Sequence, residues 1–195
     1  HNIETSDSKL LQLDYLLERL PERSKLAHKF QFGHAMVVGG EFGFGGAAIM
    51  AAQSCAKTGA GLVSLCCRAE HIGAMLARQP EVMAHGVASG QDLEPLLDAA
   101  TVLIVGPGLG RSAWSEQLLQ KSLSAGRPMV VDADALNIIA EGGLQINFSE
   151  LSWIITPHSG EAARLLGTSA RIVEEDRFSA VRALQEKYTA TVILK

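Results

Sequence analysis

Two carboxylates and an amide lie close together behind a short apolar run. They are Asp132, Asp134 and Asn137, and the apolar run is 129–131. Asp132 follows the run directly, so its carboxylate is expected at a strand tip, where it can help to organise a metal-bound phosphate or bind a hydroxyl. Asp134 has a simpler interpretation, because an aspartate where a strand opens into a helix commonly caps that helix. Asp132 is therefore the better candidate for a functional role.

A histidine stands in the same position behind the next apolar run. The segment 156–161, Thr-Pro-His-Ser-Gly-Glu, follows the run 153–155. A proline turn is rigid, so it sets His158 firmly at the strand end. An isolated histidine is usually structural, but one on a loop that follows a strand has a stronger case for function. Glu161 is interpreted more simply, as a favourable charge in the first turn of the next helix.

Two glycine-rich loops also follow apolar runs. The segment 39–48 leads from a strand into a helix, and its glycines leave backbone N–H groups open to an anion. It is not a P-loop, because no Lys-Ser/Thr pair follows, and a tight turn that needs positive φ explains it equally well. The segment 106–110, Gly-Pro-Gly-Leu-Gly, is close to a dinucleotide fingerprint. It departs from that fingerprint because Arg111 stands where the third glycine belongs.

Alternating apolar and amphipathic segments must position these four loops. The apolar runs predict strands, and the segments with helical periodicity predict helices. The predicted strands are 35–38, 62–67, 102–105, 129–131, 153–155 and 192–194, and the predicted helices are 46–58, 114–125, 160–166 and 176–188. Helices between near-continuous apolar strands favour a parallel sheet covered on both faces. Because ligands bind beyond the carboxyl ends of parallel strands, we expect the four loops to form one crevice.

Leucines at helical spacing occupy the segment 9–20, and Pro21 ends the pattern. We expect this helix to cover the edge of the core rather than to bind a partner or a membrane, because it is short and its polar face is not basic. Residues 1–27 are therefore predicted to form an N-terminal helix and linker. Residues 28–195 are predicted to form a single α/β domain.

Composition limits the kinds of partner. The chain has 195 residues, is 47% hydrophobic and carries a formal net charge of −4. This argues against nucleic acid or an anionic membrane, which both require clustered Lys and Arg. The three cysteines include an adjacent pair, Cys66 and Cys67, and have neither metal-ligand spacing nor an even number. With no apolar run of about 18 residues and a polar start at 1–8, we expect a reduced cytoplasmic protein that binds small molecules.

Five motifs in this order resemble those of the ADP- or ATP-dependent NAD(P)H-hydrate dehydratases, a ribokinase-like family. They are Gly-Gly-x-x-x-x-x-Gly-Ala from 39 to 47, Thr-Gly-Ala-Gly-Leu-Val at 58–63, Gly-Pro-Gly-Leu-Gly at 106–110, Asp-Ala-Asp-Ala-Leu-Asn at 132–137 and Thr-Pro-His-x-Gly-Glu at 156–161. The resemblance covers about 28 to 195. It implies a three-layer αβα fold around a central, mostly parallel sheet.

The resemblance implies repair of a damaged cofactor. NADH or NADPH that has been hydrated at C6 would be phosphorylated on the ring hydroxyl by ATP or ADP with Mg²⁺, and phosphate would then be eliminated. The residues expected to bind the hydrate or line its crevice are Ala47, Gly108, Gly110, Asp132, Asn137 and His158. The resemblance further implies a homo-oligomer and an epimerase domain on the N-terminal side.

Lys195 matches the lysine that opens the nucleotide-binding loop of the family. The glycine-rich continuation and the catalytic aspartate that follow it in family members lie beyond Lys195, so the resemblance implies a C-terminally incomplete fold. Residues 1–195 alone are therefore expected to be inactive. Two alternatives stay open: a small-molecule kinase on the same fold, and a non-catalytic dinucleotide-binding module if the chain truly ends at Lys195.

Overall fold

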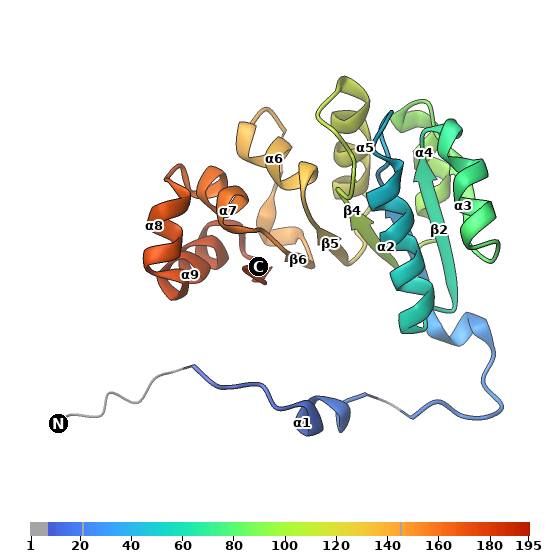
Figure 1. Cartoon of the computed structure of the whole chain (residues 1–195), viewed down its shortest axis with the longest axis horizontal. Helices are drawn as coiled ribbons and strands as arrows, with labels where there is room; N and C mark the ends of the chain where they lie inside the picture. Colours follow the sequence, from blue (N-terminus) through green and yellow to red (C-terminus); the bar gives the residue numbers. More distant parts are fainter. Residues whose placement is uncertain (1–7, 21, 145) are drawn as a thin grey trace.

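The computed structural model describes residues 8–20, 22–144 and 146–195 (Figure 1). Within them, a seven-stranded sheet has the order β3-β2-β1-β4-β5-β6-β7, and each neighbouring pair is parallel. The strands are β1 (His34–Val38), β2 (Leu62–Cys67), β3 (Met83–Gly86), β4 (Val102–Val105), β5 (Met129–Val131), β6 (Trp153–Ile155) and β7 (Thr191–Val192). The predicted α/β class and parallel sheet are confirmed.

Helices precede the first strand and connect the others. They are α1 (Leu13–Leu17), α2 (Gly45–Thr58), α3 (Ile72–Arg78), α4 (Gly90–Leu97), α5 (Ala113–Ser124), α6 (Asp134–Glu141), α7 (Ser159–Leu166), α8 (Ala170–Glu175) and α9 (Arg177–Tyr188), with 3₁₀ turns at η1 (Lys29–Phe32), η2 (Ala69–His71) and η3 (Phe148–Glu150). Serines begin several of them: the side chains of Ser89, Ser112 and Ser169 accept N–H bonds at the starts of α4, α5 and α8. Such caps satisfy donors that the first turn leaves unpaired.

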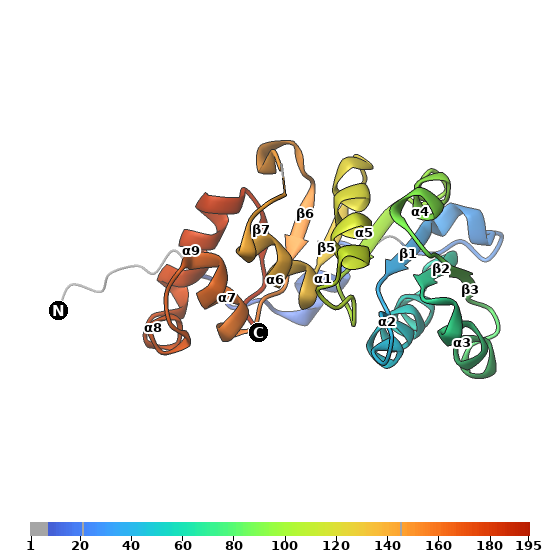
Figure 2. The ribbon, with the colours of Figure 1, turned by 90° about the horizontal axis from the view of Figure 1, so that it is seen from above.

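Two apolar cores lie on opposite faces of the sheet. Helices α2 and α3 pack on one face of β1 and β2 through residues such as Ile49 and Met75. Helices α4 and α5 cover the other face, where Leu93 and Leu118 are buried in a larger core. Figure 2 shows these two pairs of helices on either side of the strands. This part of the sheet therefore has the predicted three layers.

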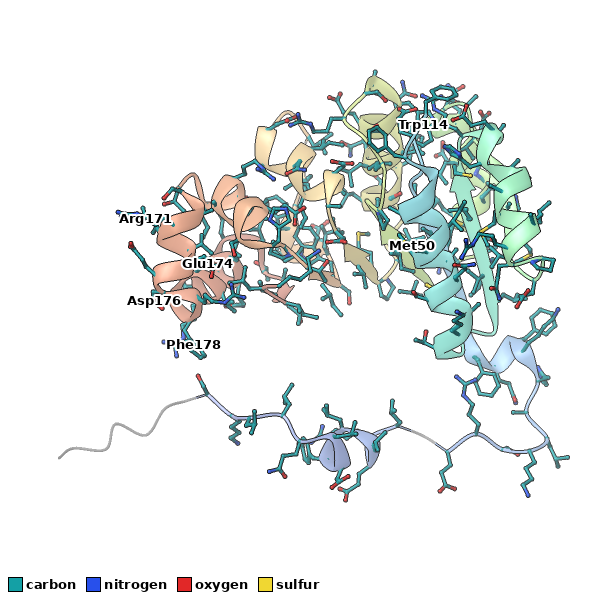
Figure 3. All side chains as sticks on the ribbon, in the orientation of Figure 1. Met50, Trp114, Arg171, Glu174, Asp176 and Phe178 are labelled. Atoms are coloured by element: carbon teal, nitrogen blue, oxygen red, sulfur yellow. The ribbon has the colours of Figure 1, made fainter. Side chains whose placement is uncertain are left out.

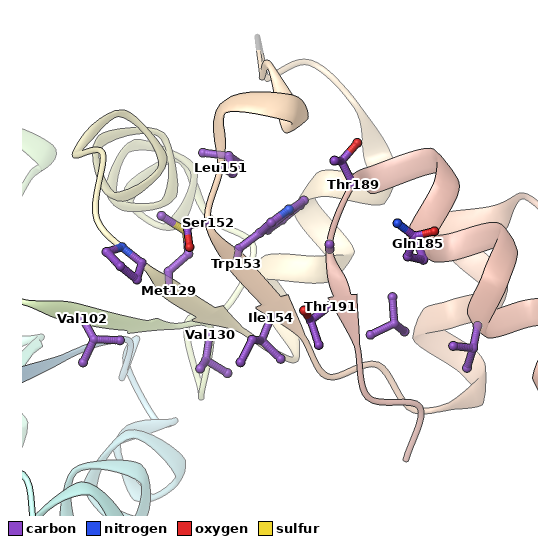
Figure 4. Close-up of a pocket in the computed structure, with 14 residues that line it drawn as sticks. Val102, Met129, Val130, Leu151, Ser152, Trp153, Ile154, Gln185, Thr189 and Thr191 are labelled. Atoms are coloured by element: carbon purple, nitrogen blue, oxygen red, sulfur yellow. The ribbon is translucent and has the colours of Figure 1, made fainter. Parts of the chain in front are cut away.

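Over β5 to β7 the sheet is covered by helices mainly on one face, whereas Ile104 of β4 still packs against the core beneath α2. Leu103, Val131 and Ile155 are buried against helices, whereas Val130 and Ile154, which point to the opposite face, are only half-buried. A hollow of about 650 Å³ opens here, lined by residues at the amino ends of the strands and by Val181 and Gln185 of α9 (Figure 4). The second helical layer thus extends only over the first strands of the sheet.

The N-terminal helix is shorter and more exposed than predicted. Only Leu13–Leu17 is helical, and the helix contains no buried residue. Leu10 is 90% exposed and Leu13 is 68% exposed, and Figure 1 shows α1 apart from the sheet. The expectation that this leucine face covers the core was therefore wrong, while the predicted break at Pro21 lies outside the described residues. The division at 27/28 stays a prediction.

No helix among the described residues is long and apolar enough to cross a membrane.

Candidate functional site

The first two loops are joined through their backbones at the carboxyl edge of the sheet. The N–H of Glu41 donates to the carbonyl of Gly108 at 2.7 Å, and the N–H of Gly40 donates to that of Pro107 at 3.3 Å. A Cβ at Gly39 would lie 2.1 Å from the Pro107 oxygen, and one at Gly108 would lie 2.2 Å from the Phe44 oxygen. Only glycine permits such an approach, so the close contact explains the glycines in both loops.

The third loop is bonded to the second. Asp134 accepts a hydrogen bond from the N–H of Gly110 at 3.0 Å, and a Cβ at Gly106 would lie 1.8 Å from the Asp132 carbonyl. Helix α6 begins behind Ala133 without any side-chain cap. The interpretation of Asp134 as a helix cap was therefore wrong, because its carboxylate spans to the neighbouring loop instead.

Asp132 links the third loop to the fourth loop and to the end of the chain. Its Oδ1 accepts from the Thr156 hydroxyl at 2.8 Å and lies 2.5 Å from the Lys195 ammonium. The side chains of Asp132 and Lys195 are 28% and 45% exposed. Asp132, which is expected to line the hydrate crevice, is thus in direct contact with Lys195, which is expected to bind the nucleotide. Both side chains remain accessible to a ligand.

Asn137 is held between two charged side chains. Its amide donates to Asp134 at 3.4 Å, and its oxygen accepts from the Arg164 guanidinium at 2.8 Å. Ala47 lies in the first turn of α2, behind the first loop, and is exposed. The structure therefore brings Asn137 into the network of the third loop, while Ala47 shares the carboxyl edge of the sheet as part of α2.

His158 caps helix α7. Its Nδ1 accepts from the N–H groups of Gly160 and Glu161 at 3.0 and 3.3 Å, and Glu161 returns the contact by accepting from the His158 N–H at 2.9 Å. Because Nδ1 is an acceptor, the proton of the neutral ring lies on Nε2, which is 3.3 Å from the Glu161 carboxylate. The His158 side chain is 55% exposed whereas that of Glu161 is 5% exposed. Glu161 therefore orients the ring as well as favouring the helix start.

Two residues of the same edge were missed by the sequence analysis as site candidates. Glu41, in the first loop, is buried and bonded to Arg68, the first residue after β2. Burial alone raises the pKa of Glu41, but hydrogen bonds from Arg68 and Ser112 and the Arg68 charge outweigh it, so this pKa lies below its ordinary value. No local sequence pattern indicates the pair, because Arg68 follows an apolar strand without a recognisable motif and its partner is distant in sequence.

The cysteines are poor nucleophiles. Burial raises the pKa of the Cys66 thiol to about 12, with a contribution from Cys67, and raises that of Cys67 to about 11. Both thiols are therefore protonated at neutral pH, and the thiolate is the reactive form. The chemistry of this edge rests on its carboxylates, its histidine and its backbone.

The carboxylates at this edge suit a cation that is bound to phosphate better than a cation that is enclosed by protein side chains. Among the described residues, no group of three or more His, Cys, Asp or Glu side chains could hold a metal ion. Mg²⁺ commonly uses only one or two carboxylates together with phosphate oxygens and water. Asp132 and Asp134 supply carboxylates enough for that smaller requirement, and Lys195 adds a positive charge beside Asp132.

Sequence comparison identifies similar proteins. A family model described as NAD(P)H-hydrate dehydratase matches residues 35–195. The chain is 48% identical to a bifunctional NAD(P)H-hydrate repair enzyme of Coxiella burnetii over 97% of the chain and 38% of that enzyme. It is 38% identical to an ADP-dependent (S)-NAD(P)H-hydrate dehydratase of Streptococcus pneumoniae over 83% of the chain and 56% of that protein. The chain thus spans little more than a third of the length of its bifunctional relative.

Structural comparison agrees on the fold. A ribokinase-like protein of Enterococcus faecalis superposes with a TM-score of 0.83 at 28% identity, over 95% of this chain and 65% of the other. An ADP/ATP-dependent NAD(P)H-hydrate dehydratase of Bacillus subtilis, co-crystallised with ATP/Mg²⁺, gives 0.79 at 24% identity, over 93% and 64%. The predicted ribokinase-like fold is confirmed.

Proposed function

The chain belongs to the NAD(P)H-hydrate dehydratase family, and we propose that it forms the hydrate-binding part of an enzyme that restores hydrated NADH or NADPH at the expense of ATP or ADP. One observation carries the proposal: the loops that hold four of the five family motifs are bonded to one another in series at one edge of the sheet. The name of the similar pneumococcal protein supports the use of ADP as co-substrate. No observation favours a small-molecule kinase instead.

The proposed reaction has two steps. The hydroxyl on C6 of the nicotinamide ring gives up its proton to a base while its oxygen attacks the terminal phosphorus of the nucleotide. An O–P bond forms, the bond from that phosphorus to the bridging oxygen breaks, and the shortened nucleotide leaves. The C6–O bond then breaks with release of phosphate, a neighbouring ring carbon loses a proton and the ring double bond returns. Such phosphoryl transfer depends mainly on positioning and on neutralising charge.

The residues have proposed roles that follow their positions. Gly108 and Gly110 let the dinucleotide approach the backbone, Ala47 leaves room at the start of α2, and the exposed ring of His158 presents Nε2 to the hydrate. Asp132 and Asn137 line the same crevice. Lys195 is positioned to bind nucleotide phosphate, and Asp132 and Asp134 are the carboxylates that would hold Mg²⁺ with that phosphate.

The setting of the enzyme is also proposed. The relatives that the chain matches over only part of their length are named bifunctional repair enzymes, which supports fusion to an epimerase domain. A reduced, cytoplasmic location fits the free cysteines. We also propose that the protein associates with itself into a homo-oligomer.

Recovery of reduced cofactor tests the function. The intact protein is incubated with NADH hydrate or NADPH hydrate and Mg²⁺, with ATP, with ADP or without nucleotide, and the absorbance of the reduced nicotinamide ring is followed. We expect recovery only when a nucleotide is present, together with release of one phosphate per ring restored. Recovery without nucleotide, or no recovery by a folded intact protein, would contradict the proposal.

A further inference from the structure

We propose that Arg68 is a positioning residue that fixes the shape of the hydrate crevice by clamping the first loop against the second; this inference rests on the proposed function. Arg68 is the first residue after β2 and therefore lies at the same edge as the four loops. Its backbone N–H donates to the carbonyl of Gly40 at 3.1 Å. The end of β2 is thus attached directly to the first loop.

The guanidinium of Arg68 makes a two-point contact with Glu41. Nε lies 2.6 Å from Oε1 and Nη2 lies 3.3 Å from Oε2. The same carboxylate accepts from the Phe42 N–H at 3.0 Å and from the hydroxyl of Ser112, which starts α5 behind the second loop. One carboxylate therefore joins β2, the first loop and the segment behind the second loop.

Two aromatic rings pack against the guanidinium group of Arg68. Its central carbon lies 4.5 Å from the centroid of Phe42 and 4.3 Å from that of Trp114. Trp114 is buried and anchored by a bond from Nε1 to the Val87 carbonyl at 3.0 Å, and Figure 3 labels it where α5 begins. Phe42 is 57% exposed. A planar guanidinium can make two hydrogen bonds to a carboxylate and stack on an aromatic ring at the same time, which an ammonium cannot do.

His71 completes the clamp from η2. Its Nε2 donates to the Glu41 carbonyl at 3.0 Å, and a Cβ at Gly45 would lie only 2.5 Å from its ring. The peptide groups around Glu41 are thus held from three directions: by β2, by the second loop and by η2. The path of the first loop into α2 is therefore fixed before any ligand binds.

The location of the pair favours a role in geometry over one in stability. The side chains of Arg68 and Glu41 are only 18% and 11% exposed, and a desolvated ion pair is often no more stabilising than apolar residues of the same volume. What the pair supplies is a fixed distance between two loops that both face the proposed substrate. Phosphoryl transfer is sensitive to such positioning, since a displacement of about 1 Å can reduce the rate about a hundredfold.

Conservative substitutions in the intact protein separate positioning from folding. Arg68→Lys keeps the positive charge but loses the two-point contact with Glu41 and the stacking on the aromatic rings. Glu41→Gln keeps the shape of the side chain but loses its negative charge. We expect either change to lower kcat/KM for the hydrate about tenfold to a hundredfold, while KM for the nucleotide stays nearly constant. The double variant should lose less than the product of the two single losses, because both changes break the same clamp.

Arg171→Lys is the matched control. Arg171 forms an ion pair with Glu175 on α8, far from Trp114 in Figure 3, and both side chains are exposed. This variant should leave the kinetics unchanged. If Arg68→Lys lowers only the unfolding temperature and leaves kcat/KM per folded molecule intact, the positioning role is overturned. If the wild-type protein neither binds nor converts the hydrate, the proposed function fails, and this inference fails with it.

Discussion

At the scale of single residues, the site depends on side chains that each serve two neighbours. Asp132 binds both Thr156 and Lys195, and His158 begins helix α7 while it leaves its ring half in solvent. Such double roles make simple truncations hard to interpret, because removing one contact disturbs the other. Variants that keep one role and remove the other are needed.

Substitution of His158 separates helix capping from ligand binding. His158→Asn retains a side-chain acceptor for the N–H groups of Gly160 and Glu161, whereas His158→Ala removes it and should lower the free energy of unfolding by about 1 kcal/mol. We expect both variants to weaken binding of the hydrate while nucleotide binding changes little, as titration calorimetry would show. Full hydrate affinity in His158→Asn would mean that the histidine serves only as a cap.

Residues with a local pattern could be predicted from the sequence, and residues paired over long distances could not. Asp132 and His158 follow apolar runs, so their place at the strand ends was predictable. Arg68 and Glu41 are 27 positions apart, and neither segment indicates that the other is near. The carboxylate of Asp134 was misassigned for the same reason, because its partner is the N–H of Gly110 in another loop.

At the scale of elements, the crevice depends on two loops whose backbones touch. The contact between Gly108 and Phe44 leaves no space for a side chain, and the φ of Gly108 is +59°. Strain at positive φ and collision with a neighbouring carbonyl are separate penalties. Gly43 in the first loop would incur the strain at positive φ but not the collision.

Alanine at Gly108 and at Gly43 distinguishes these penalties. Gly43 has a φ of +79°, and nothing lies within 4 Å of the position that a Cβ would take there, so Gly43→Ala should cost about 1 kcal/mol from strain alone. Gly108→Ala should cost a further 1 to 3 kcal/mol, about the usual penalty of overpacking, because the collision is with backbone. Denaturant unfolding measures both. Equal losses would show that the two loops separate easily.

Elements with strong periodicity were predicted well, and marginal ones were not. The strands β2, β4, β5 and β6 have the predicted bounds, because each is a continuous or nearly continuous apolar run. The edge strand β3 was missed, since Met-Ala-His-Gly is neither continuous nor alternating. The leucine segment was assigned to the core because periodicity reveals an apolar face but not what lies against it.

At the scale of the whole molecule, helices cover the two faces of the sheet unevenly. Near-continuous apolar strands predicted burial on both faces, yet Val130 and Ile154 are only half-buried and line a hollow that α9 borders (Figure 4). The hollow of about 650 Å³ lies on that side, at the amino ends of the strands, while the loops of the candidate site lie at the carboxyl ends. The chain therefore has an apolar surface that is separate from its proposed active site.

Dye binding by residues 1–195 tests this surface. A contiguous exposed apolar patch binds 8-anilinonaphthalene-1-sulfonate, whereas isolated apolar side chains bind it weakly. We expect the chain to enhance the fluorescence of the dye, and Val130→Thr with Ile154→Thr to reduce the enhancement by more than half, because threonine keeps the strand propensity but adds a hydroxyl. Circular dichroism should show an unchanged fold, because both side chains are only half-buried and threonine is well suited to a strand.

The exposed leucines of the N-terminal segment provide the control for this experiment. Leu10→Ser with Leu13→Ser removes two highly exposed apolar side chains from the segment around α1, which lies apart from the sheet in Figure 1. Their loss should leave most of the fluorescence, because they form no continuous surface with the strands. If these serines abolish dye binding and the threonines do not, the dye binds the leucine segment, and the β4 to β7 face is not the accessible apolar surface of the chain.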